Sequence, residues 1–315
     1  MATAHQSEPD SSSNLSRVAW TRGQACLPLA EILGDEPAIP LDGDIASSCV
    51  AGRVDLLVSR RLTRIDLVPI VVPHDVELGA VTMITAAIGD GPHSSLAATV
   101  ADRLAGRLEV PGELATVFRT AEEADSATER LDRLALQHPD LQRRAVQAPD
   151  AKGLVSTLSS TTLLVVGAPG GSWFQRQIFG PGHRLLVAAP GGSVVVRSAP
   201  RRCYHEAASP AGVAVGPHLA VEDARALVRH ETVPVADEGK LIGILRAAAL
   251  RKSTTDSVVA DLMEAPVAVS AAEPASAAAE LAEFFGQSPI PVIDSYGQLV
   301  GVIPQHQTTN ERSGR

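Results

Sequence analysis

The residues of this sequence whose spacing most clearly suggests chemistry are three glycines. Two residues separate Gly167 from Gly170 and nine separate Gly170 from Gly180, and all three follow the strongly apolar run 162–166. A glycine loop at the end of a strand exposes backbone N–H groups, and the helix after it directs its positive end toward the same place. A glycine-bearing loop at the end of a strand is therefore a candidate phosphate-binding loop. The alternative is that Gly167 and Gly170 only turn the chain at the carboxyl end of the strand.

The histidines and cysteines do not have the spacing of a catalytic or metal site. The nine histidines include no His-x-x-x-His or His-Glu-x-x-His pair. Cys26, Cys49 and Cys203 are odd in number and far apart, so they form neither a zinc pattern nor a disulfide framework. We therefore expect no catalytic residues, no bound metal and a reducing compartment.

Length and composition limit the classes of protein that this chain can be. It has 315 residues, a formal net charge of -9, and 45% hydrophobic but only 3% aromatic residues. The length predicts about two domains, and the acidic balance argues against nucleic-acid binding, which needs a basic face. No apolar run approaches the roughly 18 residues of a membrane span, and the polar start does not resemble a signal peptide. We expect a cytoplasmic protein without nucleic-acid or membrane partners.

The order of strand-like and helix-like segments predicts an α/β fold with a doubly wound parallel sheet. Within 81–200, strands are expected at 81–88, 113–118, 141–147, 162–166 and 193–197, with helices between them. Ser94 or Ser95 is expected to cap the first of these helices, which presents Leu96, Val100 and Leu104 on one stripe. The block 18–80 has two strand-like runs, 54–58 and 68–73, too few for a core of its own. Residues 1–17 and 307–315 are expected to be disordered tails.

The block 210–306 contains an internal repeat. Each unit has a helix, a strand with a proline near its start, an acidic turn with a glycine, and a strand with a central glycine. Pro291 of the second unit follows Pro234 of the first by 57 residues. A repeated unit of this size indicates a tandem α+β module.

The block 81–200 resembles the universal stress protein family, through Ile84–Ser94, Leu163–Gly170 and the last strand-like run at Val194–Arg197. The resemblance implies a Rossmann-like domain that binds an adenine nucleotide, ATP or AMP. Gly167, Gly170 and Gly180 would then hold the phosphates, and Asp90 would lie near the base or ribose. The sequence departs from the family at two positions. Pro181 replaces the family's Ser or Thr, and Asp90 is displaced by one residue, because the family's Asp aligns with Gly89.

The block 18–80 resembles a degenerate half of the same family. Residues 51–58 are similar to the strand before the glycine loop, and 68–73 to the last strand, but the basic stretch Arg60–Arg64 stands where the loop would be. The resemblance implies that this half binds no nucleotide and serves as a partner surface for the second. The basic stretch is either a solvated turn or an anion contact.

The block 210–306 resembles a tandem pair of cystathionine-β-synthase-type (CBS) domains, a Bateman module, through its repeat and through Leu262-Met263 between the units. Ligand-binding members end each unit with a Thr or Ser and an Asp that holds the ribose of an adenine nucleotide. Neither Ile244–Ala248 nor Val302–His306 contains that pattern. A carboxylate is the natural acceptor for a ribose diol, so the resemblance implies structural pairing more than adenosine binding.

Three functions follow from these observations. The first is a non-enzymatic stress or energy-state regulatory protein that binds an adenine nucleotide in the block 81–200. The second is an interaction scaffold that has lost its ligands and acts through the dimer surfaces of both modules. The third, a slow ATPase, lacks any general base or carboxylate pair that can be named. A homo-oligomer and a further protein partner are expected.

Overall fold

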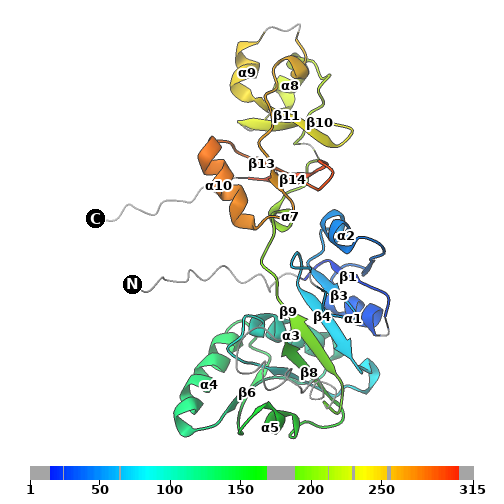
Figure 1. The fold of residues 1–315 in the computed structure, drawn as a ribbon, viewed down its shortest axis with the longest axis vertical. Coiled ribbons are helices and arrows are strands. Elements are labelled where there is room, and N and C mark those ends of the chain that lie inside the picture. The colour runs from blue at the N-terminus through cyan, green and yellow to red at the C-terminus, as the bar shows by residue number, and fades with distance from the viewer. Residues whose placement is uncertain are drawn as a thin grey trace, which may run out of the picture. The chain divides into compact units, whose positions relative to one another are not determined.

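The computed structural model describes residues 15–23, 25–63, 65–168, 189–211, 213–228, 231–253 and 257–304. The chain divides into two compact units (Figure 1). Unit 1 consists of Met1–Ile45 and Val54–Pro200, and unit 2 consists of Ala46–Arg53 and Arg201–Arg315. The chain therefore enters unit 2 briefly, returns to unit 1, and then completes unit 2.

Unit 1 is built around a sheet whose described strands run in the order β2-β1-β3-β4-β9-β8-β5-β6-β7. All neighbours in this sheet pair in parallel except β4 and β9, which are antiparallel. The predicted α/β class is confirmed, and the sheet predicted to be parallel is parallel except at the β4–β9 pair. The strands are β1 (Val18–Trp20), β2 (Ile39–Pro40), β3 (Leu56–Val58), β4 (Ile70–His74), β5 (Met83–Ala87), β6 (Gly112–Phe118), β7 (Gln142–Gln147), β8 (Thr162–Gly167) and β9 (Ser193–Arg197).

The sheet consists of two halves with the same connectivity. In the second half β5 lies between β6 and β8, and β9 follows β8; in the first half β1 lies between β2 and β3, and β4 follows β3. The first half has no described counterpart of the outer strand β7. The last strands of the halves join them, with Ile70 opposite Arg197 and His74 opposite Ser193. Because the two last strands are antiparallel, the halves are related by an approximate twofold rotation.

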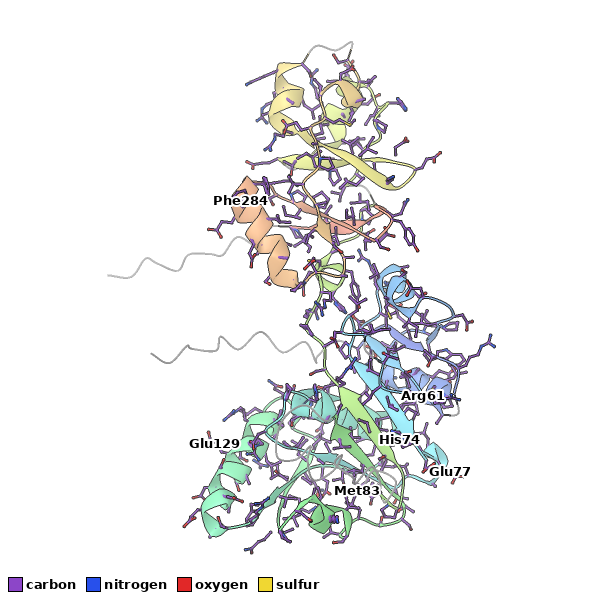
Figure 2. The ribbon with its side chains drawn as sticks, viewed as in Figure 1. Arg61, His74, Glu77, Met83, Glu129 and Phe284 are labelled. Atoms are coloured by element: carbon purple, nitrogen blue, oxygen red, sulfur yellow. The ribbon has the colours of Figure 1, made fainter. Side chains whose placement is uncertain are left out.

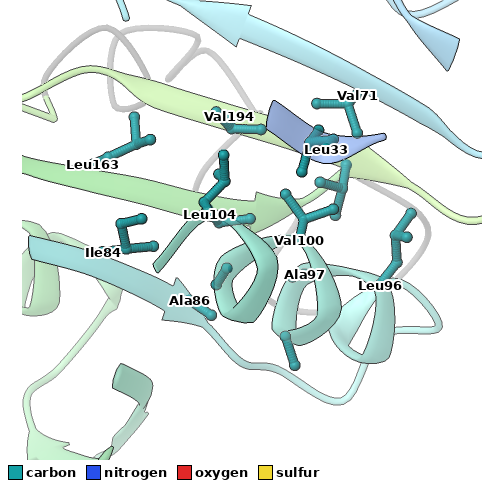
Figure 3. Packing of buried hydrophobic residues seen from close by; sticks show 14 of the residues in the cluster. Leu33, Val71, Ile84, Ala86, Leu96, Ala97, Val100, Leu104, Leu163 and Val194 are labelled. Carbon is teal, nitrogen blue, oxygen red and sulfur yellow. The ribbon is translucent and has the colours of Figure 1, made fainter. Parts of the chain in front are cut away.

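One apolar layer covers a face of this sheet. The helices in the described part of unit 1 are α1 (Cys26–Leu33), α3 (Ser94–Leu108), α4 (Ala121–Ala135) and α5 (Ala151–Val155), and the first three contribute to this layer. The predicted stripe Leu96, Val100 and Leu104 is buried on α3, and Figure 3 shows Leu104 on the side of Ile84 and Leu163 of the strands and Val100 near Leu33. Burying each such side chain stabilises the unit by about 1.5–3 kcal/mol.

Unit 2 contains the predicted repeat as two hairpins. The first is β10 (Thr232–Asp237) with β11 (Lys240–Arg246), and the second is β13 (Ile290–Ile293) with β14 (Leu299–Ile303), beside which β12 (Val269–Ser270) adds a parallel strand. Each hairpin has a register shift, after Val235 in the first and after Val292 in the second. The two shifts lie 57 residues apart, so the repeat in the sequence is a repeat in the structure.

The two hairpin turns of unit 2 exchange backbone hydrogen bonds. Leu241 N–H donates to Gly297 O at 3.0 Å, and Leu299 N–H donates to Gly239 O at 2.8 Å. Both glycines have positive φ, +82° and +79°, which a glycine adopts without a Cβ clash. The reciprocal bonds give unit 2 an approximate internal twofold axis that passes between the turns.

Helix α2 (Ile45–Gly52) contributes to the core of the second repeat of unit 2. In the first repeat, α9 (Ala247–Lys252) follows β11 and buries Leu250 in the cluster of that repeat. In the second repeat, Val50 of α2 is buried in the corresponding cluster, with Cys203, Tyr204 and Ala207. The other helices of unit 2 are α7 (Cys203–Glu206), α8 (Val221–Leu227) and α10 (Ala275–Phe285).

A hydrogen-bonded arginine anchors the end of α2. Arg53 Nη2 donates to the backbone oxygens of Val300, at 3.0 Å, and Ala208, at 3.4 Å. A Cβ on Gly301 would lie only 2.7 Å from Arg53 Nη2. The helix is therefore fitted against the second repeat, although it lies far from that repeat in the sequence.

Candidate functional site

A cavity of about 350 Å³ lies at the carboxyl ends of β5 and β6, against α4. In a sheet with this strand order, the carboxyl ends of neighbouring parallel strands form one edge, where loops and helix N-termini collect. The cavity is lined by Ile88, Gly89, Asp90, Thr116, Val117, Arg119, Glu123, Ser126, Ala127 and Arg130.

Asp90 lines this cavity and forms an ion pair with Arg130 of α4. The Asp90 side chain is 75% exposed and the Arg130 side chain 24% exposed. Arg130 Nη1 also donates to Thr116 Oγ1 at 3.3 Å, and that hydroxyl donates to Ile88 O at 2.8 Å. Strand β5 ends at Ala87, so strand alternation no longer decides the direction of Asp90. The loop after the strand turns the carboxylate toward α4.

The rest of the cavity wall combines apolar and polar groups. Ile88, Val117 and Ala127 provide apolar surface, and the Ser126 hydroxyl lies on the same wall. At the start of α4, Glu123 Oε2 accepts a hydrogen bond from the backbone N–H of Arg119 at 2.8 Å. Two arginines and two carboxylates line the cavity, so its charges balance. The arrangement can bind a flat ligand with several hydrogen-bonding groups, and it pairs no nucleophile with a base.

Gly167 ends β8 at the same edge of the sheet, where it allows a close approach of the loop before α3. A Cβ on Gly167 would lie 2.9 Å from the Cβ of His93, closer than real side chains approach. This close packing gives a structural reason for a glycine at this position, and it differs from the turn of the chain that was the alternative to a phosphate loop. Gly170 and Gly180 lie outside the described residues, as do Pro181 and Arg64.

His93 joins the end of β9 to the start of α3. Its Nδ1 accepts the backbone N–H of Ser198 at 3.1 Å and lies 2.6 Å from Ser198 Oγ. Because Nδ1 is an acceptor, the proton of the neutral ring is on Nε2. Burial, followed by the positive charge of Arg197, lowers the pKa of His93. The neutral ring thus fixes this edge of the sheet.

Ser94 does not cap α3, contrary to the prediction. The N-cap position is His93, and no side chain caps the helix. Ser94 is the first helical residue, so its hydroxyl reaches back to the preceding loop. Its Oγ accepts the N–H of Gly89 at 3.1 Å and donates to Gly89 O at 2.8 Å, which holds the backbone of the cavity rim.

The corresponding edge of the first half is filled by its own side chains. A Cβ on Gly23, after β1, would lie 3.3 Å from the Cβ of Arg60 and 3.0 Å from Cys26 Sγ. The buried Ser59 accepts a hydrogen bond from Thr21 Oγ1 at 3.2 Å. Arg60 therefore approaches the glycine after β1, while Arg60 and Arg61 remain exposed.

In the described part of the chain, no group of three or more His, Cys, Asp or Glu residues could hold a metal ion. The same residues include no helix long and apolar enough to cross a membrane. In unit 2, Arg246 at the end of β11 pairs with Glu264 at 2.9 Å.

No family model and no curated protein matches this sequence. Among solved structures, the cytosolic domain of the Mg²⁺ channel MgtE in complex with ATP is similar, with 26% identity, a TM-score of 0.30, and coverage of 33% of this chain and 45% of that one. This chain thus spans less than half of that structure. CBSX2 from Arabidopsis thaliana, a CBS-pair protein, is similar at 24% identity and a TM-score of 0.30, over 33% of this chain and 89% of that one.

Two further similar structures are CBSX2 in complex with AMP and a CBS domain pair/ACT domain protein from Thermotoga maritima. The first has 25% identity and a TM-score of 0.29, over 32% of this chain and 87% of that one. The second has 19% identity and a TM-score of 0.31, over 33% of this chain and 90% of that one. The similarity is thus to CBS-domain pairs and covers about a third of this chain.

Proposed function

We propose that this chain is a non-enzymatic regulatory protein of the cytoplasm whose unit 1 binds an adenine nucleotide, ATP or AMP. The observation that carries the proposal is the cavity beside Asp90, at the edge of the sheet where β5, β6 and β8 end. Ligands of open α/β sheets bind at the carboxyl ends of the strands, near the point where the strand order reverses. Here the order reverses at β5, between β6 and β8.

The cavity wall suits a base and ribose. Ile88 and Val117 offer apolar contact to a heteroaromatic ring, and Thr116 and Ser126 carry hydroxyls that can donate or accept. The exposed carboxylate of Asp90 can accept hydrogen bonds from both hydroxyls of a ribose. These bonds would replace its ion pair with Arg130. The phosphates would extend toward Gly167 and the start of α3, whose N-terminus favours negative charge. In this proposal Gly170 and Gly180 complete the phosphate loop.

The connectivity of unit 1 supports its resemblance to paired universal stress protein domains. Each half has its first strand in the middle and its last strand at the shared boundary. The antiparallel pair of last strands makes the first half a fixed partner for the second. In the first half, Arg60 covers the glycine that follows β1, so we assign nucleotide binding to the second half only.

The twofold arrangement of hairpins in unit 2 supports a CBS-domain pair. Reciprocal bonds between the turns make the two repeats one body. Because neither Ile244–Ala248 nor Val302–His306 contains an Asp, we propose that unit 2 acts through association and binds no nucleotide.

A second candidate function is a scaffold without ligand. The ion pair between Asp90 and Arg130 favours it, because a ligand must break that pair before the carboxylate is available. The close packing of His93 on Gly167 also favours it, since that glycine is then explained without a phosphate.

Titration calorimetry of the full chain with ATP, ADP and AMP separates these functions. We expect binding heat, and a loss of affinity of at least tenfold in Ser126→Trp, because an indole at this exposed position of α4 would fill the cavity. Thr128→Trp, exposed on the same helix but outside the cavity lining, is the matched control and should bind as the unchanged chain does. No heat with any of the three nucleotides at millimolar concentration would leave only the scaffold.

A further inference from the structure

Strand β7 is an open edge of the sheet of unit 1. It lies beyond β6 at the end of the strand order, and no described strand pairs with its other side. It has six residues without a proline, and its register with β6 has no shift. Helix α4 packs on β6 and β7, and in Figure 2 Glu129 of α4 marks this side of the sheet, whereas His74 marks the joint between the halves.

The backbone groups of β7 point alternately toward β6 and toward the open side. Ala148 N–H donates to Phe118 O at 2.9 Å, so the even-numbered residues of β7 bond to β6. The backbone N–H and C=O groups of the three odd-numbered residues therefore point away from β6. These residues are Arg143, Ala145 and Gln147, and all three are exposed.

This open row of backbone groups ends on both sides of the strand. Leu141 N–H is used within the chain, since it donates to His138 O at 3.2 Å, and Pro149 has no N–H. Three residues with free donors thus remain, and Ala145 is the middle one. Such a row is self-complementary, because an antiparallel copy of it places an acceptor opposite every donor.

The two arginines of β7 are held by carboxylates of their own chain. Arg143 Nη1 donates to Asp132 Oδ1 of α4 at 2.5 Å, and Arg144 Nη2 lies 2.6 Å from Glu113 Oε1 of β6. Charged side chains on an edge strand normally discourage a further strand from pairing. Here a carboxylate balances each positive charge, so the edge remains available.

We propose that two copies of this chain join their sheets through β7, with the two strands antiparallel about a twofold axis at Ala145. Arg143 of each copy then pairs with Gln147 of the other, and Ala145 pairs with its own equivalent. The three pairs exchange two backbone hydrogen bonds each. The contact is the same for both copies and closes after two. This inference goes beyond the proposed function, since it requires no nucleotide.

The side chains of β7 favour this register over its neighbours. With the axis at Ala145, Arg144 lies opposite Val146 and no arginine meets an arginine. An axis at Arg144 or at Arg143 places that arginine opposite its own equivalent, and like charges directly opposite are destabilising. An axis at Val146 places Arg143 opposite Pro149, which has no N–H to donate.

The other edge of the sheet and the surroundings of β7 also favour a closed pair of copies. The opposite edge is β2, whose two residues include Pro40, and a proline does not donate to a further strand. A cavity of about 550 Å³ lies at the start of β7, beside Leu136, which is 85% exposed. In the antiparallel pair, the residues that follow β7 of the second copy lie at this place and cover Leu136.

Disulfide formation between copies of the full chain tests the register. Ala145→Cys should give a covalent dimer under mild oxidation, because paired Cα atoms lie about 5.5 Å apart. Gln147→Cys alone should not, because its two copies lie about 14 Å apart along the strands. A mixture of Arg143→Cys and Gln147→Cys should form the mixed dimer. The native cysteines are buried, and Ser160→Cys, at an exposed position of unit 1, is the unlinked control.

A covalent dimer from Gln147→Cys but not from Ala145→Cys would refute the register. Failure of every β7 variant to link, or the molar mass of a single chain by light scattering at about 100 µM, well above a micromolar Kd, would refute the pairing itself.

Hydrogen exchange of single amides tests the same pairing without any cross-link. In the unchanged chain at about 100 µM, the amide of Gln147 should exchange at least 100-fold more slowly than in Ala145→Pro. The proline removes both central bonds between the copies, whereas the bonds to β6 remain, since the lost N–H points to the open side. The amides of Val146 and Ala148 should stay protected in both proteins, which shows that the variant is folded.

Ala145→Thr is the matched control, because threonine keeps the N–H and suits a strand, and the amide of Gln147 should stay protected. Fast exchange of that amide in the unchanged chain, or equal protection in Ala145→Pro, would overturn the proposal.

Discussion

Truncating Val50 to alanine should destabilise unit 2 and leave unit 1 unchanged. Val50 belongs to α2, which precedes most of unit 1 in the sequence, yet it is 7% exposed and buried with Cys203 and Tyr204. The change removes two methyl groups, worth about 0.8 kcal/mol each by transfer. The cavity left behind adds to this cost, so we expect a loss of about 2 kcal/mol.

Differential scanning calorimetry of the full chain measures the effect if each unit gives its own transition. For a unit of about 120 residues, 1 kcal/mol corresponds to about 3–5 °C, so the transition of unit 2 should fall by about 6–10 °C. Hydrogen exchange should increase in α7 and β14 and stay the same in β5 and β8. Ala51→Ser, at the exposed neighbouring position, is the control and should shift neither transition. A shift confined to the transition of unit 1 would refute the assignment of α2 to unit 2.

Three more predictions concern ionisable groups that are buried or half-buried. Arg144→Met should lower the free energy of unfolding by about 2–3 kcal/mol, because the 6% exposed Glu113 carboxylate loses the guanidinium that lies 2.6 Å away. Adding Glu113→Gln to this variant should recover part of the loss, as measured by urea unfolding. Burial raises the pKa of Cys203 to about 11. The folded chain therefore keeps this proton where the unfolded chain loses it, and stability should fall as pH rises from 9 to 11, less so in Cys203→Ala. The lowered pKa of His93 acts in the other direction. The stabilisation that the neutral His93 ring contributes is fully present above the ordinary pKa of 6.5 and is lost as the pH falls. His93→Gln should therefore make the free energy of unfolding fall less steeply at acid pH.

Local sequence patterns determined the type and approximate position of many elements. Runs of β-branched residues marked β8 and β9, and the stripe on α3 marked its buried face. The repeat of helix, strand, turn and strand marked both hairpins of unit 2. These features are readable because backbone propensity, side-chain alternation and turn chemistry act between residues a few positions apart.

Contacts between distant segments were decided only by the tertiary structure. Helix α2 has just two buried residues, Cys49 and Val50, so no stripe marks it as a helix or assigns it to unit 2. The partner of Asp90 is Arg130, forty residues later, and the atom nearest a Cβ on Gly167 belongs to His93. The sequence shows which charged residues and glycines are present, but the order of the strands in the sheet decides which of them come into contact. That order is set by the joint packing of the whole apolar core, and no single segment encodes it.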